Sequence, residues 1–369
     1  MYLTITSTML LIGLFQIAFL LRSLSQSILG QHQRKELQLF FILLGLSFLD
    51  GIFLEEGIYL GFPFLFMILT PICFLLGPIF HIYVLRNTYP TLEVDFSVIK
   101  KHLVAPVIII SLYIPFYLIY NSSEKIAFLN GADYNGFYTY FIMELIRIIN
   151  ILMNVFYLTL TFRRISLHQK YIKENYSNLE DYSFKWMQKM ILGLLGIVFF
   201  CAVTKVLNIS YLNEIPMVLW ILVFNWQVLV HVKNNINILN EPIDVKNVNI
   251  KVSEDELKKI ALQLEEAVNT KELYLDLALK LEDVAKEIGV NRQKISEVLN
   301  QYMKTTFYDY INTKRVEMAK KLLLDKKYTG NLLMLSLDCG FKSRSVFYTA
   351  FKKNTLLTPS QYKKENLIP

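Results

Sequence analysis

The chain has 369 residues, of which 54% are hydrophobic and only 19% are charged. Soluble chains carry about 25% charged residues, so the composition excludes an ordinary soluble protein and indicates the membrane class. The formal net charge is +7.

Charge is unevenly spread along the chain. Residues 1–232 hold 15 basic and 13 acidic side chains, whereas the last 137 residues hold 23 and 18. From Lys280 onward there are 17 basic and 9 acidic residues, a surplus that suits a polyanionic partner. The three cysteines, Cys73, Cys201 and Cys339, are far apart, so we expect no disulfide framework, metal site or cofactor.

Seven apolar segments are long enough to cross a bilayer, which takes about 20 residues. The first lacks a basic start and a small-residue cleavage site, so we interpret it as a retained span. A soluble protein with seven buried helices is the alternative, but it does not explain the regular charge alternation described next. The predicted spans are 2–21, 37–54, 62–85, 102–120, 137–162, 187–207 and 212–232.

The loops between these segments predict the orientation. Loops one, three and five carry twelve Lys and Arg residues, whereas loops two, four and six carry only Lys125 and Lys205. Because cytoplasmic loops hold the excess of positive charge, we expect the N-terminus outside and the C-terminal part inside, at a bacterial inner membrane. Within the fifth segment, Glu144 and Arg147 share a helical face. They are either a candidate input site or a pair that satisfies itself.

After the last span, a polar linker precedes a predicted helix. Ser253 and Glu256 form a capping box, with Glu256 placed to reach back to the Ser253 backbone. The helix then carries a narrow apolar stripe that includes Leu257 and Leu264. The stripe packs either on its own domain or on a second chain, and we expect it to be the seam of a homodimer that responds to movement of the last span.

Residues 281–300, LEDVAKEIGVNRQKISEVLN, predict two short helices around a tight turn at Gly289. Asn291 is placed to cap the second helix. Ile295, Val298 and Leu299 form its inward face, so Arg292 and the intervening polar residues face outward. Such an outward face is typical of a helix that enters the major groove.

A second unit repeats the arrangement around Gly340. Leu332, Leu335 and Ser336 take the inward positions of its first helix, and Phe347, Ala350 and Phe351 form the inward face of its second. Arg344 on the outward face is able to donate two hydrogen bonds to guanine. A longer helix over 307–324 joins the two units and fixes their separation.

Four stretches, LEDVAKEIGV, YINTKRVEMAKKLL, CGFKSRSVFYTAFKK and TPSQY, together resemble the DNA-binding domain of the AraC family over about the last 95 residues. The resemblance implies two helix-turn-helix subdomains that read successive major grooves. By this resemblance the residues that read bases are Gln293, Ser296, Glu297, Arg344, Ser345, Tyr348 and Thr349. We expect contacts to the DNA backbone from Asn291, Arg292, Lys342, Lys352 and Lys353.

The sequence departs from the family at three positions. Met303 and Leu356 stand where the family usually has Gly after each recognition helix, and a residue other than Gly at positive φ costs about 1 kcal/mol. Either these turns adopt another geometry or the domain is less stable. Ser336 replaces the usual Ala, which is a change between small residues.

We therefore expect an all-α protein with a seven-helix transmembrane input domain (1–232), a linker with an amphipathic helix (233–272) and an AraC-type DNA-binding domain (273–369). The favoured function is a membrane-bound transcription regulator, with double-stranded DNA, the lipid bilayer and RNA polymerase as expected partners. The alternative is a receptor or transporter whose tail docks a protein. No P-loop, HExxH motif or nucleophile elbow is present, so an enzyme is not expected.

Overall fold

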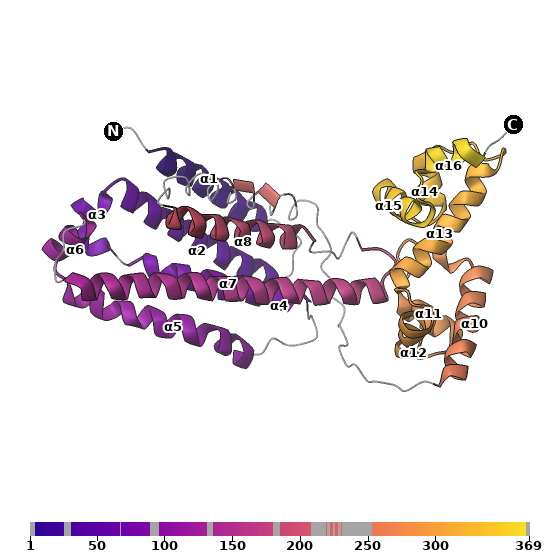
Figure 1. Cartoon of the computed structure of the whole chain (residues 1–369), viewed down its shortest axis with the longest axis horizontal. Helices are drawn as coiled ribbons and strands as arrows, with labels where there is room; N and C mark the ends of the chain where they lie inside the picture. Colours follow the sequence, from indigo (N-terminus) through magenta and orange to yellow (C-terminus); the bar gives the residue numbers. More distant parts are fainter. Residues whose placement is uncertain are drawn as a thin grey trace. The chain divides into compact units, whose positions relative to one another are not determined.

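The computed structural model divides the chain into two units, each described here by itself (Figure 1). The first is Met1–Ser166 with Phe184–Asp244, and the second is Leu167–Ser183 with Val245–Pro369. All named elements in the described part of the chain are helical, as the sequence predicts. The described residues are 4–25, 31–66, 68–88, 96–130, 136–179, 185–207, 219, 222–223, 226–227, 230 and 253–366.

Long helices in the first unit lie over the apolar segments of the sequence. They are α1 (Ile5–Ser25), α2 (Gln31–Glu55), α4 (Cys73–Thr88), α5 (Phe96–Ile119), α7 (Gly136–Asn175) and α8 (Lys185–Val206). Short elements connect them, namely α3 (Ile58–Gly61), η1 (Pro63–Leu65), η2 (Thr70–Ile72) and α6 (Ser122–Leu129). Long helices thus lie over the first six predicted spans, although in the third, 62–85, the long helix begins only at Cys73, after the short elements η1 and η2. The seventh, 212–232, lies outside the described residues apart from isolated positions.

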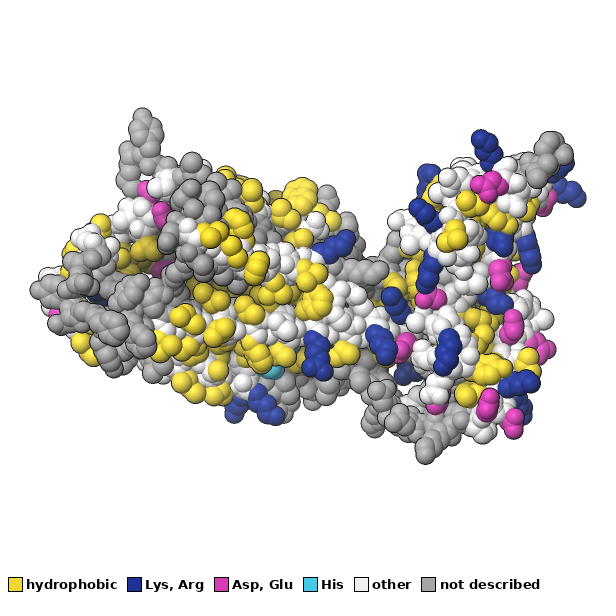
Figure 2. Space-filling model, viewed as in Figure 1, with side chains coloured by type: hydrophobic (Ala, Val, Ile, Leu, Met, Phe, Trp, Pro, Cys, Tyr) yellow, Lys and Arg dark blue, Asp and Glu magenta, His cyan; other side chains and the backbone are white. Residues whose placement is uncertain are grey.

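Four stretches of the described residues are helical, long and apolar enough to cross a membrane, so the predicted set of seven is supported only in part. They are Thr6–Ser25, Arg34–Glu55, Pro63–Thr88 and Ile148–Asn175. Large apolar side chains also lie on the outside of this unit: Phe15 is 79% exposed and Phe199 is 73% exposed. Figure 2 shows hydrophobic side chains spread over the visible face of the first unit. Extended apolar surface of this kind marks a membrane or protein contact.

Polar contacts join the start of α2, the end of α4 and an inner turn of α7. Arg86, near the end of α4, forms an ion pair with Glu36, near the start of α2. Arg164 of α7 donates from Nε to Thr88 Oγ1 at 2.7 Å and from Nη2 to the Thr88 carbonyl at 3.1 Å. The start of α2, the end of α4 and the Arg164 turn of α7 therefore lie at one end of the unit.

The second unit begins with a subdomain built on α10 (Glu254–Thr270). Its other elements are η4 (Leu273–Leu275), α11 (Leu281–Ile288), α12 (Arg292–Glu297) and the π-helical turn η5 (Val298–Tyr302). One hydrophobic core contains the apolar stripe of α10 together with inward residues of the other helices. Leu264, for example, is fully buried. The stripe thus packs on its own domain, and the expectation that it forms the seam of a homodimer is wrong.

The start of α10 also differs in one detail from the prediction. Ser253 caps the helix by accepting a hydrogen bond from the Glu256 N–H, as expected. The Glu256 side chain, however, does not reach back to the Ser253 backbone as the capping box predicts. It accepts a hydrogen bond from Lys294 Nζ at 2.6 Å instead, because α12 brings a cation within reach of the carboxylate.

A second subdomain follows, and one helix serves both. It comprises α13 (Phe307–Leu324), α14 (Leu332–Asp338), α15 (Arg344–Thr355) and α16 (Pro359–Asn366). The first turns of α13 contribute Phe307 and Ile311 to the first core, and its later turns contribute Ala319 and Leu323 to the second. As the sequence predicts, α13 joins the two cores, so their separation is fixed by a single helix.

Both predicted turn glycines have left-handed backbone geometry. Gly289 has φ 66° and Gly340 has φ 82°. A Cβ at Gly340 would lie 2.5 Å from the Tyr274 carbonyl oxygen, so this position also needs glycine for close approach of the two subdomains. Ser336, which replaces the family's Ala, is fully buried and donates its hydroxyl to the Leu333 carbonyl at 2.7 Å.

The two departures from glycine have different outcomes. Leu356 adopts the left-handed conformation with φ 64°, so the strain predicted for a residue with a Cβ is present there. Met303 has φ −86°, and the following residue, Lys304, takes the left-handed conformation with φ 52°. The turn after the first recognition helix therefore has another geometry, which shifts the left-handed residue by one position.

Candidate nucleic-acid interface

The second recognition helix, α15, presents the predicted polar face to solvent. Ser343 caps it by accepting a hydrogen bond from the Val346 N–H at 3.3 Å. Phe347 and Phe351 are fully buried, and this anchors the inner face. Arg344, Ser345 and Thr349 are exposed, whereas Tyr348 is half-buried. The four side chains predicted to read bases thus share one accessible face.

Arg344 is held by its neighbour one turn along α15. Its guanidinium carbon lies 5.1 Å from the centre of the Tyr348 ring, and Nη2 donates to Tyr348 Oη at 3.1 Å. Stacking on the ring leaves the remaining N–H groups able to donate elsewhere. The arrangement favours one orientation of the guanidinium on an otherwise exposed helix.

The first recognition helix, α12, is less exposed than α15. Asn291 caps it by accepting from the Gln293 N–H at 2.8 Å, as the sequence predicts. Gln293, Ser296 and Glu297 are only partly exposed. Two of these side chains accept from amides one turn later: Ser296 Oγ from Asn300 Nδ2 at 3.3 Å, and Glu297 Oε1 from Gln301 Nε2 at 2.9 Å. A base contact by either residue competes with these local bonds.

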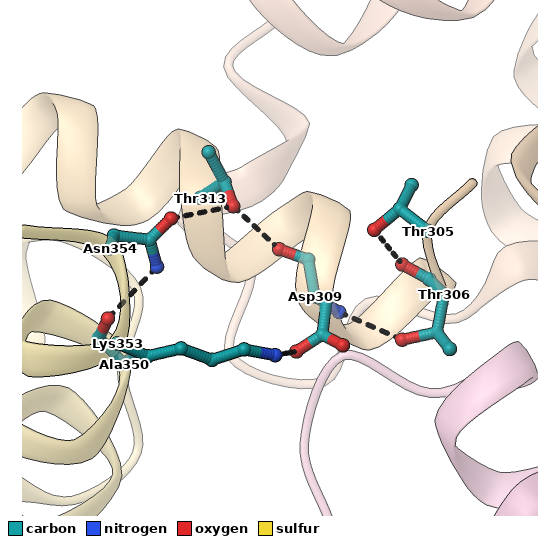
Figure 3. Close-up of polar contacts among 7 residues, drawn as sticks. All are labelled: Thr305, Thr306, Asp309, Thr313, Ala350, Lys353 and Asn354. Carbon is teal, nitrogen blue, oxygen red and sulfur yellow. Dashed lines mark hydrogen bonds and ion pairs between the residues drawn. The ribbon is translucent and has the colours of Figure 1, made fainter. Parts of the chain in front are cut away.

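The two lysines at the end of α15 have different surroundings. Lys352 and Lys353 are both exposed. Lys353 Nζ donates to Asp309 Oδ1 at 2.7 Å, which joins α15 to α13 (Figure 3). Asn354 accepts from Thr313 Oγ1 at 3.0 Å beside this ion pair. Lys353 therefore contributes to the junction between the recognition helix and the connecting helix.

A polar groove of about 490 Å³ lies between the ends of the two recognition helices. Figure 3 shows part of its wall, where Thr306 accepts from the Asp309 N–H and Lys353 meets the Asp309 carboxylate. Lysine, threonine and asparagine side chains are common donors to phosphate oxygens. The groove is lined by Asn300, Lys304, Thr305, Thr306, Asp309, Thr313, Lys353 and Asn354.

Two residues of this unit are absent from the sequence-based prediction. Lys304 enters the groove because the left-handed conformation moves to its position, and the sequence gives no signal for that shift. Arg315 is a buried residue of α13, only 1% exposed. Its signal is visible in the sequence, because Arg315 interrupts the apolar spacing between Ile311 and Ala319. A charged residue inside an apolar stripe indicates a buried cation with partners.

The candidate input pair in the first unit lies in α7. Both Glu144 and Arg147 belong to this helix, but their side chains lie outside the described residues. Their pairing therefore stays a prediction. Among the residues that the structure does describe, no group of three or more His, Cys, Asp or Glu side chains is placed to hold a metal ion.

Part of the second unit is similar in sequence to known proteins. Residues 284–365 match the family described as a helix-turn-helix domain. The melibiose operon regulatory protein of Escherichia coli (strain K12) is 33% identical over 89 residues, which are 24% of this chain and 29% of that protein. An uncharacterized HTH-type transcriptional regulator in the cgkA 5' region of Pseudoalteromonas carrageenovora is 33% identical over 86 residues, 23% of this chain and 49% of that protein.

The xylose operon regulatory protein of Escherichia coli (strain K12) is 27% identical over 88 residues, 24% of this chain and 22% of that protein. A solved structure of a protein with unknown function from Listeria innocua is 26% identical, covers 30% of this chain and 95% of that chain, and has a TM-score of 0.24. The chain thus spans less than a third of the length of the two operon regulators. Its C-terminal part carries a helix-turn-helix domain of the AraC type.

Proposed function

We propose that this protein is a membrane-bound, sequence-specific transcription regulator that couples a membrane or extracytoplasmic signal to DNA binding. Support comes from the pairing of an apolar helical unit with an AraC-type helix-turn-helix domain. The melibiose and xylose relatives are named as operon regulatory proteins.

The observation that carries the proposal is the geometry of the second unit. Two helices, each capped at its N-terminus, pack one on each of the two cores that α13 joins, and one face of each contains the predicted base-reading residues. Recognition helices on a rigid connector are able to enter successive major grooves of one duplex. A module that only docks a protein does not require two such faces.

Base contacts would come from the two recognition helices, and phosphate contacts would come from the groove between them. Arg344, already stacked on Tyr348, is suited to donate two hydrogen bonds to guanine, and Glu297 is suited to accept from a cytosine amino group. Lys304 and Lys353 line the groove between the helices and are suited to the phosphates that run between two major grooves. Phosphate contacts position the protein, and base contacts give the specificity.

The first unit spans the membrane in a fixed orientation. Glu36, Arg86 and Arg164 lie at one end of the first unit, and the arginines there belong to the segments predicted to face the cytoplasm. Placing that end inside follows the positive-inside rule. It also puts the second unit in the compartment that contains the DNA.

Cysteine labelling in intact cells tests the orientation. Ser123 and Lys173 are both exposed and lie near loops four and five. Ser123→Cys is expected to react with a membrane-impermeant maleimide, whereas Lys173→Cys is expected to react only after the cells are lysed. The unsubstituted protein gives the background. Labelling of Lys173→Cys in intact cells contradicts the orientation.

DNA binding is tested with the full-length protein in lipid nanodiscs. Duplexes selected from a randomised pool should converge on a common sequence, and affinity should fall steeply as salt rises because phosphate contacts release counterions. A receptor or transporter whose tail docks a protein partner is the second candidate, favoured by the same apolar helices. Under that function no sequence is enriched and no salt-dependent binding is measured.

A further inference from the structure

The four residues after α7 are part of the DNA-binding unit. Tyr176 pairs with Lys280 in the isolated antiparallel bridge of the described residues. Next to it, the Ser177 N–H donates to the Leu279 carbonyl at 3.1 Å. Tyr176, Ser177, Asn178 and Leu179 are all less than 10% exposed. This segment is therefore docked on the chain immediately before α11, although it follows the fifth predicted span in the sequence.

Arg315 holds this docked segment in place through hydrogen bonds. Its Nη1 donates to the Ser177 carbonyl and its Nη2 to Ser177 Oγ, both at 3.2 Å. The same guanidinium donates to the carbonyls of Tyr274 and Asp276, at 2.7 Å each. Burial lowers the pKa of Arg315 to about 10, with the Asp276 carboxylate opposing the shift, so the side chain stays charged at neutral pH. A buried cation with these partners forms strong, charge-assisted hydrogen bonds.

The last turns of α7 also contact the first recognition helix. Arg292, the first residue of α12, donates from Nη1 to Tyr171 Oη at 3.4 Å. Lys280, which directly precedes α11, lies with Nζ 6.0 Å from the centre of the Tyr176 ring. Both cations lie at helix starts, and in a helix-turn-helix these starts meet the DNA backbone and the bases. The segment therefore occupies groups that DNA would need.

The docked segment is covalently continuous with α7, which begins in the apolar first unit. Helix α7 is continuous from Gly136 to Asn175, and its last turns, from Leu167, belong to the second unit. A single helix therefore links the apolar part of α7 to the docked segment. The sequence instead predicts transmission through the last span and the linker after it. Residues 231–252 lie outside the described residues.

We propose that residues 167–179 are the element through which the apolar first unit controls DNA binding. When this segment is docked, it holds Arg292 and covers the edge of the first helix-turn-helix. When it is released, Arg292 and that edge become available to DNA. This inference rests on the proposed function. In the docked state α15 keeps its exposed face, so the protein reads one major groove well and the other poorly. Release of the segment allows α12 to read the second major groove as well.

A disulfide across the bridge tests the proposal in the full-length protein in nanodiscs. Residues paired in an antiparallel bridge have Cα atoms about 4.5 to 5.5 Å apart, within the range that a disulfide spans. The variant combines Tyr176→Cys with Lys280→Cys. Each single substitution, which loses one of the two side chains, serves as a control that cannot form the cross-link. The probe is a duplex selected from a randomised pool by the reduced double variant.

We expect the cross-link to form on mild oxidation and to weaken binding to this duplex about tenfold relative to the same protein reduced, which is the loss expected for about 1.4 kcal/mol. The loss should concentrate at base pairs read by α12, and the single variants should not respond to oxidation. Failure of the cross-link to form, or equal binding by both forms, overturns the proposal. If no form binds any duplex, the proposed function is wrong, and the yield of cross-link still measures docking.

Discussion

The guanidinium carbon of Arg344 lies 5.1 Å from the centre of the Tyr348 ring while Nη2 donates to the Tyr348 hydroxyl at 3.1 Å. Both residues stand on the accessible face of α15, four positions apart. A free arginine side chain loses about 2 kcal/mol of rotamer entropy when it is fixed. Stacking on Tyr348 before DNA arrives reduces that loss at the moment of binding.

Removal of Arg344 should relax sequence preference. We expect Arg344→Ala to cost about 1 to 3 kcal/mol at one base pair of the selected duplex and to leave affinity for random DNA much less affected. Arg344→Lys should likewise keep binding to random DNA without restoring the sequence preference, because an ammonium does not donate in a fork. The measurement is competition between single-base variants of the duplex. Equal losses on selected and random DNA argue against base reading.

Neighbouring Lys352 and Lys353 should differ in their effect on affinity. Lys352→Ala is expected to weaken binding to all sequences alike and to reduce the salt slope by about 1. Lys353→Ala should have a smaller effect, because the Asp309 carboxylate at 2.7 Å already offsets part of its charge. Lys258→Ala, an exposed lysine of α10, is the control for the change in net charge. An equal salt slope for Lys352→Ala and the unsubstituted protein contradicts the phosphate contact.

Periodicity in the second unit predicted the fold well. The inward sets Ile295, Val298 and Leu299, then Phe347, Ala350 and Phe351, are buried as expected, because apolar spacing of three and four leaves a helix only one face to bury. Turn positions at Gly289 and Gly340 were predictable for a similar reason, since left-handed geometry there favours glycine.

Long-range contacts account for what the sequence did not predict. By periodicity alone, the apolar stripe of α10 fits its own domain and a second chain equally well. Only the packed core shows which of these two partners it contacts. Arg315 meets Ser177, which lies 138 positions away in the sequence, so no local pattern reveals that partner. Lys353 reads as a solvated lysine until the fold brings Asp309 within 2.7 Å. Such pairs depend on topology rather than on spacing.

Cys339 should be inert in the folded protein. Its side chain is fully buried, and burial raises the pKa of the thiol from 9.0 to about 12. The thiolate is the reactive form, so alkylation by iodoacetamide at pH 8 requires the second subdomain to open. We expect modification about 100-fold slower than in urea-unfolded protein, measured by mass spectrometry of the Cys339 peptide.

The same thiol predicts the direction of alkaline destabilisation. Its folded pKa lies above its unfolded pKa, so its contribution to stability is fully present below about pH 9 and is lost as pH rises toward 12. Cys339→Ala should therefore lose less stability than the unsubstituted protein over this range, as judged by protease susceptibility of the second unit. Parallel pH profiles of the two proteins contradict the raised pKa.

Leu356→Gly should stabilise the second subdomain. Leu356 has φ 64° and is 83% exposed, so its side chain gains little from packing while its Cβ strains the left-handed backbone. Relief of that strain is worth about 1 kcal/mol, which corresponds to about a fivefold lower population of opened protein. The rate of Cys339 alkylation should fall by the same factor. Met303→Gly is the control without strain: Met303 has φ −86°, so glycine relieves no strain there, removes the packing of Met303 on the first core and adds freedom to the unfolded chain. A faster rate in Leu356→Gly, or an equal slowing in both variants, would show that the strain is not located at Leu356.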